Sequence, residues 1–342
     1  MLNRITVLCG SAAPFGCGVH DYSERLNAEF VRRGITVHAL REPITLTGIP
    51  SVLGKLRQSR PDLLLMQYPN AAYGGSLAPH LLVNVVRGAP LVLVLHEFEP
   101  AHPLRKMSIG LLGGARAIIV TNEMDRDHLV KWYPWVAKRV WIVPLASNIT
   151  GRPWRPDPVF TVVYFGLIRP AKGLEEFLEC ARLVKARNAP IRFRAIGALT
   201  GGAAEYGQSF LDAARSLDIE VLVGASEDEV ATALSAASAA YLPFPDGATA
   251  RRGSILAAAS CGLPILSTTG PFTTPELAAT VLRASSPRVA AELLLSLQVD
   301  ARQLQDAHAR SQRFGRTYTW DAVAERHLDV FNAGCALSRV SC

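Results

Sequence analysis

Short runs of consecutive apolar residues recur along the chain, with helix-length amphipathic segments between them. The runs are continuous rather than alternating, which is typical of parallel strands that are covered on both faces. In the first half they predict strands at 5–9, 36–40, 63–66, 91–95, 117–120 and 140–143. Helical patterns lie between them at 19–33, 77–87, 104–112 and 123–131. This alternation of strand and helix predicts a doubly wound parallel sheet.

The alternation stops at residues 146–158, which contain three prolines, one glycine and no apolar periodicity. Such a stretch is typical of an interdomain linker. Beyond it, strands are predicted at 160–165, 191–196, 220–223, 239–242 and 264–267. Helices are predicted at 173–187, 204–217, 228–236 and 254–261, and a last one near 320–331.

The pattern therefore predicts an α/β protein of two Rossmann-like domains, with parallel sheets that face each other across a cleft. We expect the domains at residues 1–148 and 149–317, and we expect a C-terminal helix, about 318–334, to pack back on the first domain. In sheets of this kind, ligands bind beyond the carboxyl ends of the strands. The loops that follow strands are thus the places to look for chemistry.

The composition of the chain leads us to expect a soluble protein of the cytoplasm. Of the 342 residues, 49% are hydrophobic and 19% charged, and no run of 18 apolar residues predicts a membrane span. The apolar start predicts a first strand rather than a signal peptide. The six cysteines are scattered without a CxxC pair, so reduced thiols are expected and neither a zinc site nor a disulfide framework.

The positive charge is concentrated in the first half of the chain. Residues 1–150 hold 16 Lys and Arg against 10 Asp and Glu, whereas the rest hold 20 against 19. A basic half predicts an anionic acceptor or an acidic membrane surface. Nucleic acid is less favoured, because no basic helix or aromatic platform accompanies the charge. Residues 131–141 mix Trp with Lys and Arg, as membrane-interface segments do, but a connection with buried Trp explains them equally well.

Six segments that follow or end strands carry the candidate chemistry, in this order: PFGCGV at 14–19, VLHEF at 94–98, AIIVT at 117–121, WIVP at 141–144, YFGLIRPAKG at 164–173, and LPFPDGATARRGS at 242–254 with GLPI at 262–265. Together they resemble glycosyltransferase family 4 of the GT-B superfamily over about residues 4–331. A nicotinamide-dinucleotide fingerprint is disfavoured, because no third glycine follows Gly16 and Gly18 at the required spacing.

The resemblance implies a retaining glycosyltransferase that uses a nucleotide-diphosphate sugar, with no cofactor and no obligatory metal. It implies that Gly16 and Gly18 let the backbone approach the donor, and that His96 contacts the transferred sugar. It also implies that Lys172 holds the donor diphosphate. The family's arginine position holds Leu167, so we expect Arg169 to supply that charge.

The last segment departs from the family pattern. Both carboxylates of the family's E-x7-E pair are missing, and Thr249 and Ala257 stand in their place. Because a helix begins here, free N–H groups and guanidiniums can bind an anion. We expect the diphosphate to contact one of the two arginines and the backbone amides of Gly253 and Ser254, and we expect Asp246 to take over a sugar hydroxyl. The residues of this group are Asp246, Gly247, Arg251, Arg252, Gly253 and Ser254.

The acceptor is expected to be a glycan or a lipid-linked glycan of bacterial surface polysaccharide or glycolipid assembly, reached in the cytoplasm or at the inner face of the membrane. Three alternatives stay open. The arginines could form an interdomain salt bridge instead of a phosphate site. The protein could be a sugar-nucleotide epimerase of the same fold, or a catalytically inactive partner subunit that only binds nucleotide sugars.

Overall fold

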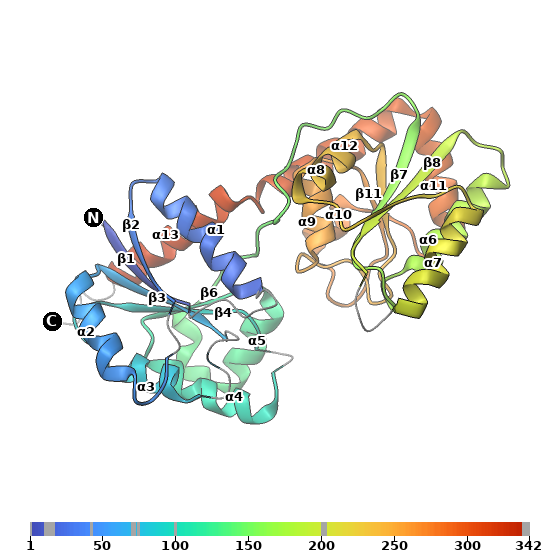
Figure 1. Ribbon diagram of the computed structural model, residues 1–342. Helices are drawn as coiled ribbons and strands as arrows, with labels where there is room; N and C mark the ends of the chain where they lie inside the picture. The colour runs from blue at the N-terminus through green and yellow to red at the C-terminus, as the bar shows by residue number, and fades with distance from the viewer. Residues whose placement is uncertain are drawn as a thin grey trace. The chain divides into compact units, whose positions relative to one another are not determined.

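The structure is a computed structural model that describes residues 2–9, 18–41, 44–69, 73, 76–98, 101–199 and 204–336 (Figure 1). The chain divides into two compact units. The N-terminal unit comprises Met1–Pro144 and Trp320–Cys342, and the C-terminal unit comprises Leu145–Thr319. Within the described residues, each unit contains a six-stranded sheet in which every pairing is parallel.

The sheet of the N-terminal unit has the strand order β2-β1-β3-β4-β5-β6. Its strands are β1 (Arg4–Leu8), β2 (Thr36–Leu40), β3 (Leu63–Tyr68), β4 (Leu91–Leu95), β5 (Ala117–Val120) and β6 (Val140–Ile142). Its helices are α1 (Gly18–Arg32), α2 (Ile49–Ser59), α3 (Ala78–Val85), α4 (Pro103–Ile109), α5 (Glu123–Trp132) and α13 (Trp320–Ala336), with the 3-10 helices η2 (Gly110–Gly114) and η3 (Pro134–Arg139). Figure 1 shows α1 and α13 on one face of this sheet and α2 to α5 on the other.

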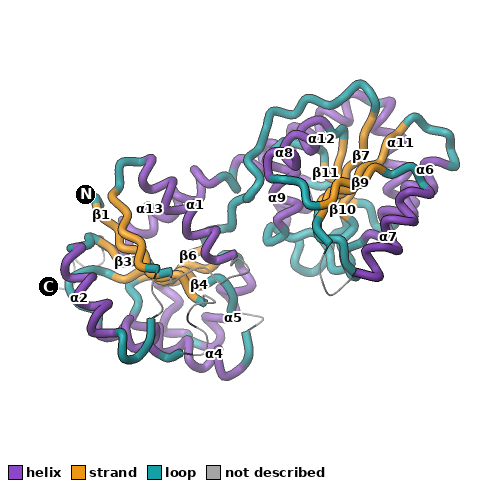
Figure 2. The backbone as a smooth tube through the Cα atoms, viewed as in Figure 1, coloured by secondary structure: helices purple, strands orange, loops and turns teal. Residues whose placement is uncertain are grey.

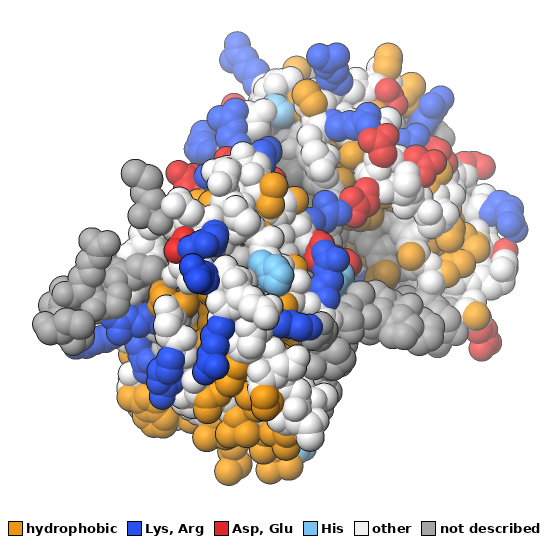
Figure 3. All heavy atoms as spheres, turned by 60° about the vertical axis from the view of Figure 1, so that its left-hand side comes forward, with side chains coloured by type: hydrophobic (Ala, Val, Ile, Leu, Met, Phe, Trp, Pro, Cys, Tyr) orange, Lys and Arg blue, Asp and Glu red, His pale blue; other side chains and the backbone are white. Residues whose placement is uncertain are grey.

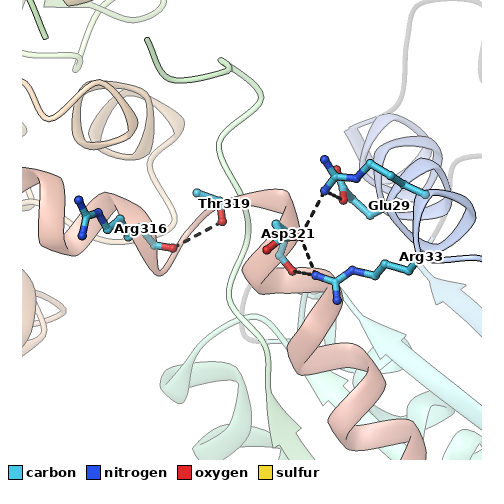
Figure 4. A network of polar contacts seen from close by, with 6 residues as sticks. Glu29, Arg33, Arg316, Thr319 and Asp321 are labelled. Atoms are coloured by element: carbon cyan, nitrogen blue, oxygen red, sulfur yellow. Dashed lines mark hydrogen bonds and ion pairs between the residues drawn. The ribbon is translucent and has the colours of Figure 1, made fainter. Parts of the chain in front are cut away.

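Helix α13 is separated from the rest of its unit by most of the chain, yet it packs on α1. At its first turn, Asp321 accepts hydrogen bonds from Arg33 at 2.7 Å and from Arg32 at 3.2 Å (Figure 4). Further along the same face, the ring of Phe331 lies 5.7 Å from that of Phe30. Surface ion pairs contribute little, so the buried aromatic contacts provide most of the stabilisation here.

The C-terminal unit has the strand order β12-β11-β10-β7-β8-β9. Its strands are β7 (Phe160–Phe165), β8 (Ile191–Gly197), β9 (Glu220–Val223), β10 (Ala239–Leu242), β11 (Ile265–Ser267) and β12 (Leu282–Arg283). Its helices are α6 (Leu174–Lys185), α7 (Ala204–Ser216), α8 (Glu227–Ala236), α9 (Gly253–Ser260), α10 (Pro275–Thr280), α11 (Pro287–Val299) and α12 (Ala301–Arg316). Helix α11 packs on α6, and α12 packs on α9, so these two late helices cover opposite faces of the sheet.

The predicted strands are all present, several with the same bounds, and residues 146–158 form neither helix nor strand (Figure 2). Four helices and a strand were not predicted, and these are α2, α10, α11, α12 and β12. One predicted helix, 104–112, is divided into α4 and the 3-10 helix η2, which begins at Gly110. In the described part of the chain, no helix is both long and apolar enough to cross a membrane.

In both sheets the strand order reverses at one point, between β1 and β3 in the first and between β7 and β10 in the second. At such a reversal, the loops at the carboxyl ends of the two strands diverge and leave a crevice for ligands. The fold therefore selects the loops after β7 and β10 in the C-terminal unit, and those after β1, β3 and neighbouring β4 in the N-terminal unit.

Candidate functional site

The loops after β7 and β10 carry the cations that the sequence singled out. Residues 166–173 connect β7 to α6, and residues 243–252 connect β10 to α9. Because β7 and β10 are paired neighbours in the sheet, these two loops leave it side by side. Lys172 and Arg169 belong to the first loop, and Arg251 and Arg252 belong to the second. The fold thus brings the two predicted cation pairs to one place.

Lys172 is at the centre of this group of charges. Its pKa lies below the usual range of a lysine, first because of partial burial and then because the positive charges of Arg169 and Arg252 are near. The carboxylate of Asp246 opposes that shift. Clustered like charges destabilise a folded chain by themselves, so an anion at this point would be strongly favoured. We refer to Lys172, Arg169 and Arg252 as the cation cluster.

Arg252 is held in place by three partners of its own loop. Its guanidinium lies over the ring of Phe244, 4.0 Å from the ring centroid, and donates to the carbonyl oxygen of Gly247 at 3.2 Å. It also forms an ion pair with Asp246. The arginine side chain is largely buried, whereas that of Asp246 is mostly exposed. A guanidinium fixed on two sides has little entropy left to lose when it binds a phosphate.

The two loops approach each other through glycine backbone. Gly173 has a φ of +79°, and a Cβ at this position would lie closer than 3.0 Å to the carbonyl oxygen of Pro243. Gly247 has a φ of +91°, and its missing Cβ leaves room for the backbone of Gly270 in the loop after β11. Both glycines are therefore required by conformation and by space. They keep the cation cluster compact.

The loop after β11 was not predicted to belong to the site. Thr273 donates to the carbonyl oxygen of Ala248 at 2.7 Å and accepts from the backbone N–H of Gly270 at 2.9 Å. Thr268 bonds the carbonyl oxygen of Phe244. The signal in the sequence was the TTG stretch directly after a strand, which is typical of a loop that a neighbouring backbone approaches.

Two helices begin at the cation cluster. Helix α6 starts after Gly173, and α9 starts at Gly253 with no side-chain cap at Arg252. The first intrahelical bonds of α9 come from Ile255 and Leu256 to the carbonyl of Arg252, so the N–H groups of Gly253 and Ser254 precede the helical ladder. Free amides and the positive end of the helix dipole add to the potential for binding an anion.

The two positions that hold carboxylates in the family offer none here. Ala257 is fully buried in α9, and Thr249 is partly buried in the loop before it. Asp246 is the residue that we expected to bind a sugar hydroxyl. Its carboxylate forms an ion pair with Arg252. Within its own unit, Arg252 pairs with Asp246, so this guanidinium already has a partner on its own loop.

In the N-terminal unit, His96 follows β4, next to the reversal point. Its Nε2 lies 2.8 Å from Oε1 of Gln67 at the end of β3, and its ring meets that of Tyr22 edge to face at 5.0 Å. Burial, with a smaller effect of His327, lowers the pKa of His96 to about 3. The imidazole is therefore neutral at pH 7 and can exchange hydrogen bonds with a hydroxyl, but it does not act as a general acid.

The glycine-rich segment after β1 holds two of the predicted donor-binding residues, Gly16 and Gly18. Gly18 is the first residue of α1, which begins beyond the loop after β1. Gly16 lies outside the described residues. Glu97, beside His96, is exposed. Among the described residues, no group of His, Cys, Asp and Glu is arranged to hold a metal ion.

This geometry can bind a ligand with two neighbouring phosphates. The cation cluster supplies one ammonium and two guanidiniums, and the start of α9 supplies amides. Charge of this kind also stabilises a phosphate that is leaving from a carbon atom.

A family model matches most of the C-terminal unit. Residues 159–297 match the family model described as "Glycosyl transferases group 1". That segment runs from the start of β7 to α11 and includes the cation cluster. A comparison with curated proteins found no match.

Solved structures match over nearly the whole chain. A glycosyltransferase from Rickettsia africae ESF-5 has a TM-score of 0.70 at 9% identity, with coverage of 98% of this chain and 99% of that one. HepE of Anabaena, in complex with UDP and glucose, has a TM-score of 0.64 at 14% identity, with 97% and 100% covered. The lipopolysaccharide outer core galactosyltransferase WaaB has a TM-score of 0.60 at 13% identity, with 96% and 99% covered.

At these identities, the structural matches establish the fold. The protein has the GT-B fold of two Rossmann-like domains, as the sequence predicted. Residues 159–297 of its C-terminal unit are similar to the group 1 glycosyltransferase family model.

Proposed function

We propose that this protein is a glycosyltransferase that moves a sugar from a nucleotide-diphosphate donor to an acceptor with retention of anomeric configuration. The observation that supports this most is the convergence of Lys172, Arg169 and Arg252 at the point where β7 and β10 diverge. The family model covers this same segment. Its assignment to family 4, as a variant without the paired carboxylates, belongs to the proposal.

In the proposed reaction, the bond between the anomeric carbon and the β-phosphate oxygen breaks, and the acceptor hydroxyl oxygen bonds to that carbon on the same face. The hydroxyl proton passes to the released diphosphate. Lys172 and the arginines stabilise the charge that grows on the leaving oxygen, which does not require a metal or a cofactor. His96, neutral at pH 7, binds a hydroxyl of the transferred sugar.

The proposed donor contacts follow the geometry of the two loops. Lys172 and Arg252 bind the diphosphate, Arg169 or Arg251 adds a second guanidinium, and the amides of Gly253 and Ser254 complete the contact. Asp246 and Gly247 hold Arg252, and a sugar hydroxyl can displace Asp246 from that pair. In the N-terminal unit, we propose that Gly16 and Gly18 let the protein backbone approach the donor closely, because a glycine has no side chain to keep the donor away.

For the donor and acceptor, the solved relatives suggest where to begin. HepE has been solved with UDP and with UDP-glucose, so a uridine nucleotide is the first donor to test. WaaB is named for lipopolysaccharide outer core, which agrees in kind with a glycan or lipid-linked glycan acceptor. We place the reaction in surface polysaccharide or glycolipid assembly, in the cytoplasm or at the inner face of the membrane.

A thermal-shift screen with UDP, GDP, ADP, TDP and CMP tests the proposal. We expect one of the four diphosphates to raise the unfolding temperature, because a ligand at 100 times its dissociation constant stabilises the folded state by about 2.7 kcal/mol. CMP, which has a single phosphate, should produce a small shift. If none of the diphosphates stabilises the protein, the proposed donor site is wrong.

The diphosphate so identified is then tested as a sugar donor, with and without acceptor glycans. Transfer to an acceptor, or slow release of the diphosphate in water, supports the proposed reaction. Conversion of the donor sugar into its epimer without an acceptor would point to an epimerase instead. Binding without either reaction would support an inactive partner subunit, for which the substitutions at Thr249 and Ala257 are the motivating observation.

A further inference from the structure

The imidazole of His96 belongs to a buried polar group at the carboxyl ends of β3 and β4. The backbone N–H of His96 donates to the carbonyl oxygen of Tyr68 at 2.8 Å, which extends the pairing of β3 and β4 to this residue. Gln67, the residue before Tyr68, is fully buried, and His96 is 8% exposed. Tyr22 and His327 complete the group from α1 and α13, the two helices that Figure 1 shows on one face of this sheet.

The hydrogen bond with Gln67 decides which ring nitrogen of His96 carries the proton. Oε1 of Gln67 lies 2.8 Å from Nε2 of His96. An amide oxygen can only accept, so Nε2 carries the hydrogen and donates it. Burial lowers the pKa of His96 to about 3, so the neutral ring has no second proton for Nδ1. Nδ1 has no hydrogen-bond partner among the described residues and is not enclosed, so it is an acceptor that a ligand can use.

A second set of hydrogen bonds holds the ring of Tyr22 against His96. Nδ1 of His327 lies 2.8 Å from the carbonyl oxygen of Val323, so this nitrogen donates. Burial lowers the pKa of His327 to about 4, so its Nε2 is an acceptor, and the hydroxyl of Tyr22 donates to it at 3.3 Å. The ring of Tyr22 meets that of His96 edge to face, with the centroids 5.0 Å apart. The imidazole of His96 therefore has a fixed plane as well as a fixed tautomer.

Charged side chains have little influence on His96. Figure 3 shows Lys, Arg, Asp and Glu side chains at the surface of one face of the molecule. Among the described residues, His327 is the one titratable group that shifts the pKa of His96, and it is itself neutral at pH 7. Glu97 is exposed, and Asp125 accepts from the backbone N–H of Phe98 at 3.2 Å. Nδ1 of His96 therefore stays unprotonated between about pH 5 and pH 8.

The stability of the fold does not explain Gln67. Its Nε2 is buried without a hydrogen-bond partner. An enclosed amide N–H group without a partner costs free energy, so an apolar side chain of similar size would suit this position in the sheet at least as well. The one partner of the Gln67 side chain among the described residues is His96. The amide is therefore explained best by its effect on that imidazole.

We propose that Gln67 is a positioning residue that fixes His96 as a hydrogen-bond acceptor, so that Nδ1 accepts from a hydroxyl of the transferred sugar. The sugar then requires a group that donates at this point, and a group of similar size that cannot donate, such as fluorine, is rejected. The inference rests on the proposed function for the identity of the ligand as a sugar. The tautomer of His96 is a property of the ligand-free protein and does not depend on that function.

Nuclear magnetic resonance of the ligand-free protein, isotope-labelled in its histidine rings, tests the tautomer. We expect the His96 signals, identified by their loss in His96→Asn, to show a hydrogen on Nε2 and none on Nδ1 between about pH 5 and pH 8. In Gln67→Met the hydrogen should move at least partly to Nδ1, because a hydrogen on Nε2 would lack a partner whereas one on Nδ1 can bond water. A hydrogen on Nδ1 in the wild type would overturn the proposal.

Transfer from sugar nucleotides that lack one hydroxyl tests the specificity, with UDP-glucose as the first parent compound. For the wild type, replacement of one particular hydroxyl by hydrogen or by fluorine should lower kcat/KM at least about tenfold, since neither group donates to Nδ1. Gln67→Met should transfer the parent sugar at least about tenfold more slowly and lose little more with these two analogues. Its unfolding temperature should stay close to that of the wild type.

Gln67→Glu separates a positioning role from a structural one. The carboxylate still accepts from Nε2, but its charge raises the pKa of His96, so Nδ1 gains a proton as the pH falls. We expect this variant to transfer nearly as the wild type does at pH 8 and to lose activity at lower pH, where the wild type keeps it. Met66→Leu is the matched control, because adjacent residues of β3 point to opposite faces, and it should change neither rate nor specificity.

Full activity of Gln67→Met, or transfer of every fluorine analogue as fast as the parent sugar, would overturn the proposal. If the wild type transfers no sugar nucleotide, the proposed function is wrong, whereas a hydrogen on Nε2 of His96 would still support the tautomer that Gln67 selects.

Discussion

Replacing Lys172 by Ala is expected to lower the rate of sugar transfer by about 10²–10³-fold while the unfolding temperature stays near that of the wild type. Lys172 is partly exposed on a loop and makes no side-chain hydrogen bond to a described residue, so its loss leaves no buried partner unsatisfied. What is lost is the charge that the leaving diphosphate requires. Because Arg169 and Arg252 repel Lys172, its removal should even relieve a small strain in the free protein.

Arg252→Ala is expected to have an effect of similar size on transfer, together with a modest loss of stability. This arginine connects Asp246, Gly247 and the ring of Phe244, and its loss frees the loop before α9. Arg182→Ala serves as the matched control, since it removes an exposed cation that pairs with Glu179 on α6. Near-normal transfer by both Lys172→Ala and Arg252→Ala would contradict the assignment of the diphosphate to this cluster.

Gly173→Ala is expected to be the most damaging substitution in the C-terminal unit, at about 3 kcal/mol or more in the free energy of unfolding. A left-handed φ of +79° costs a non-glycine residue about 1–2 kcal/mol. The new Cβ would also overlap the carbonyl oxygen of Pro243, which is backbone and has no rotamer to change. The loops after β7 and β10 would have to separate, so donor affinity should fall as well.

Chemical denaturation of Gly173→Ala and Gly54→Ala checks this prediction. Gly54 lies inside α2, where a Cβ would meet nothing within 4 Å, so its replacement should stabilise the protein by about 0.5–1 kcal/mol. If Gly173→Ala unfolds like the wild type and binds the donor nucleotide equally well, the close contact between the loops after β7 and β10 is not required for folding or binding.

The sequence predicted strands better than late helices, for a physical reason. Parallel strands such as β4 and β5 are buried on both faces, so their apolar runs stand out from the surrounding sequence. Helix α12 buries mainly Ala307, Ser311, Phe314 and Gly315, and small or polar residues of this kind give a weak apolar stripe. Helix α2 contains Gly54 in its interior, which disfavours a helix by propensity although packing stabilises it.

For the candidate site, motif spacing led to Lys172, Arg169 and the two arginines, but their arrangement depends on contacts distant in sequence. No local pattern shows that Thr273, in the loop after β11, bonds the backbone of the loop that holds Arg252. The neutral state of His96 likewise follows from Gln67, Tyr22 and His327, which come from β3, α1 and α13. Only the folded chain brings these residues together.

The central claim is that the cation cluster recognises a diphosphate. Calorimetric titration of the best nucleoside diphosphate, and of its monophosphate, into the wild type and Lys172→Ala tests it most directly. We predict that the wild type binds the diphosphate at least about tenfold more tightly than the monophosphate, a difference of about 1.4 kcal/mol, and that Lys172→Ala loses most of this difference. Equal affinities for the two nucleotides in the wild type, or an unchanged preference in Lys172→Ala, would contradict the account.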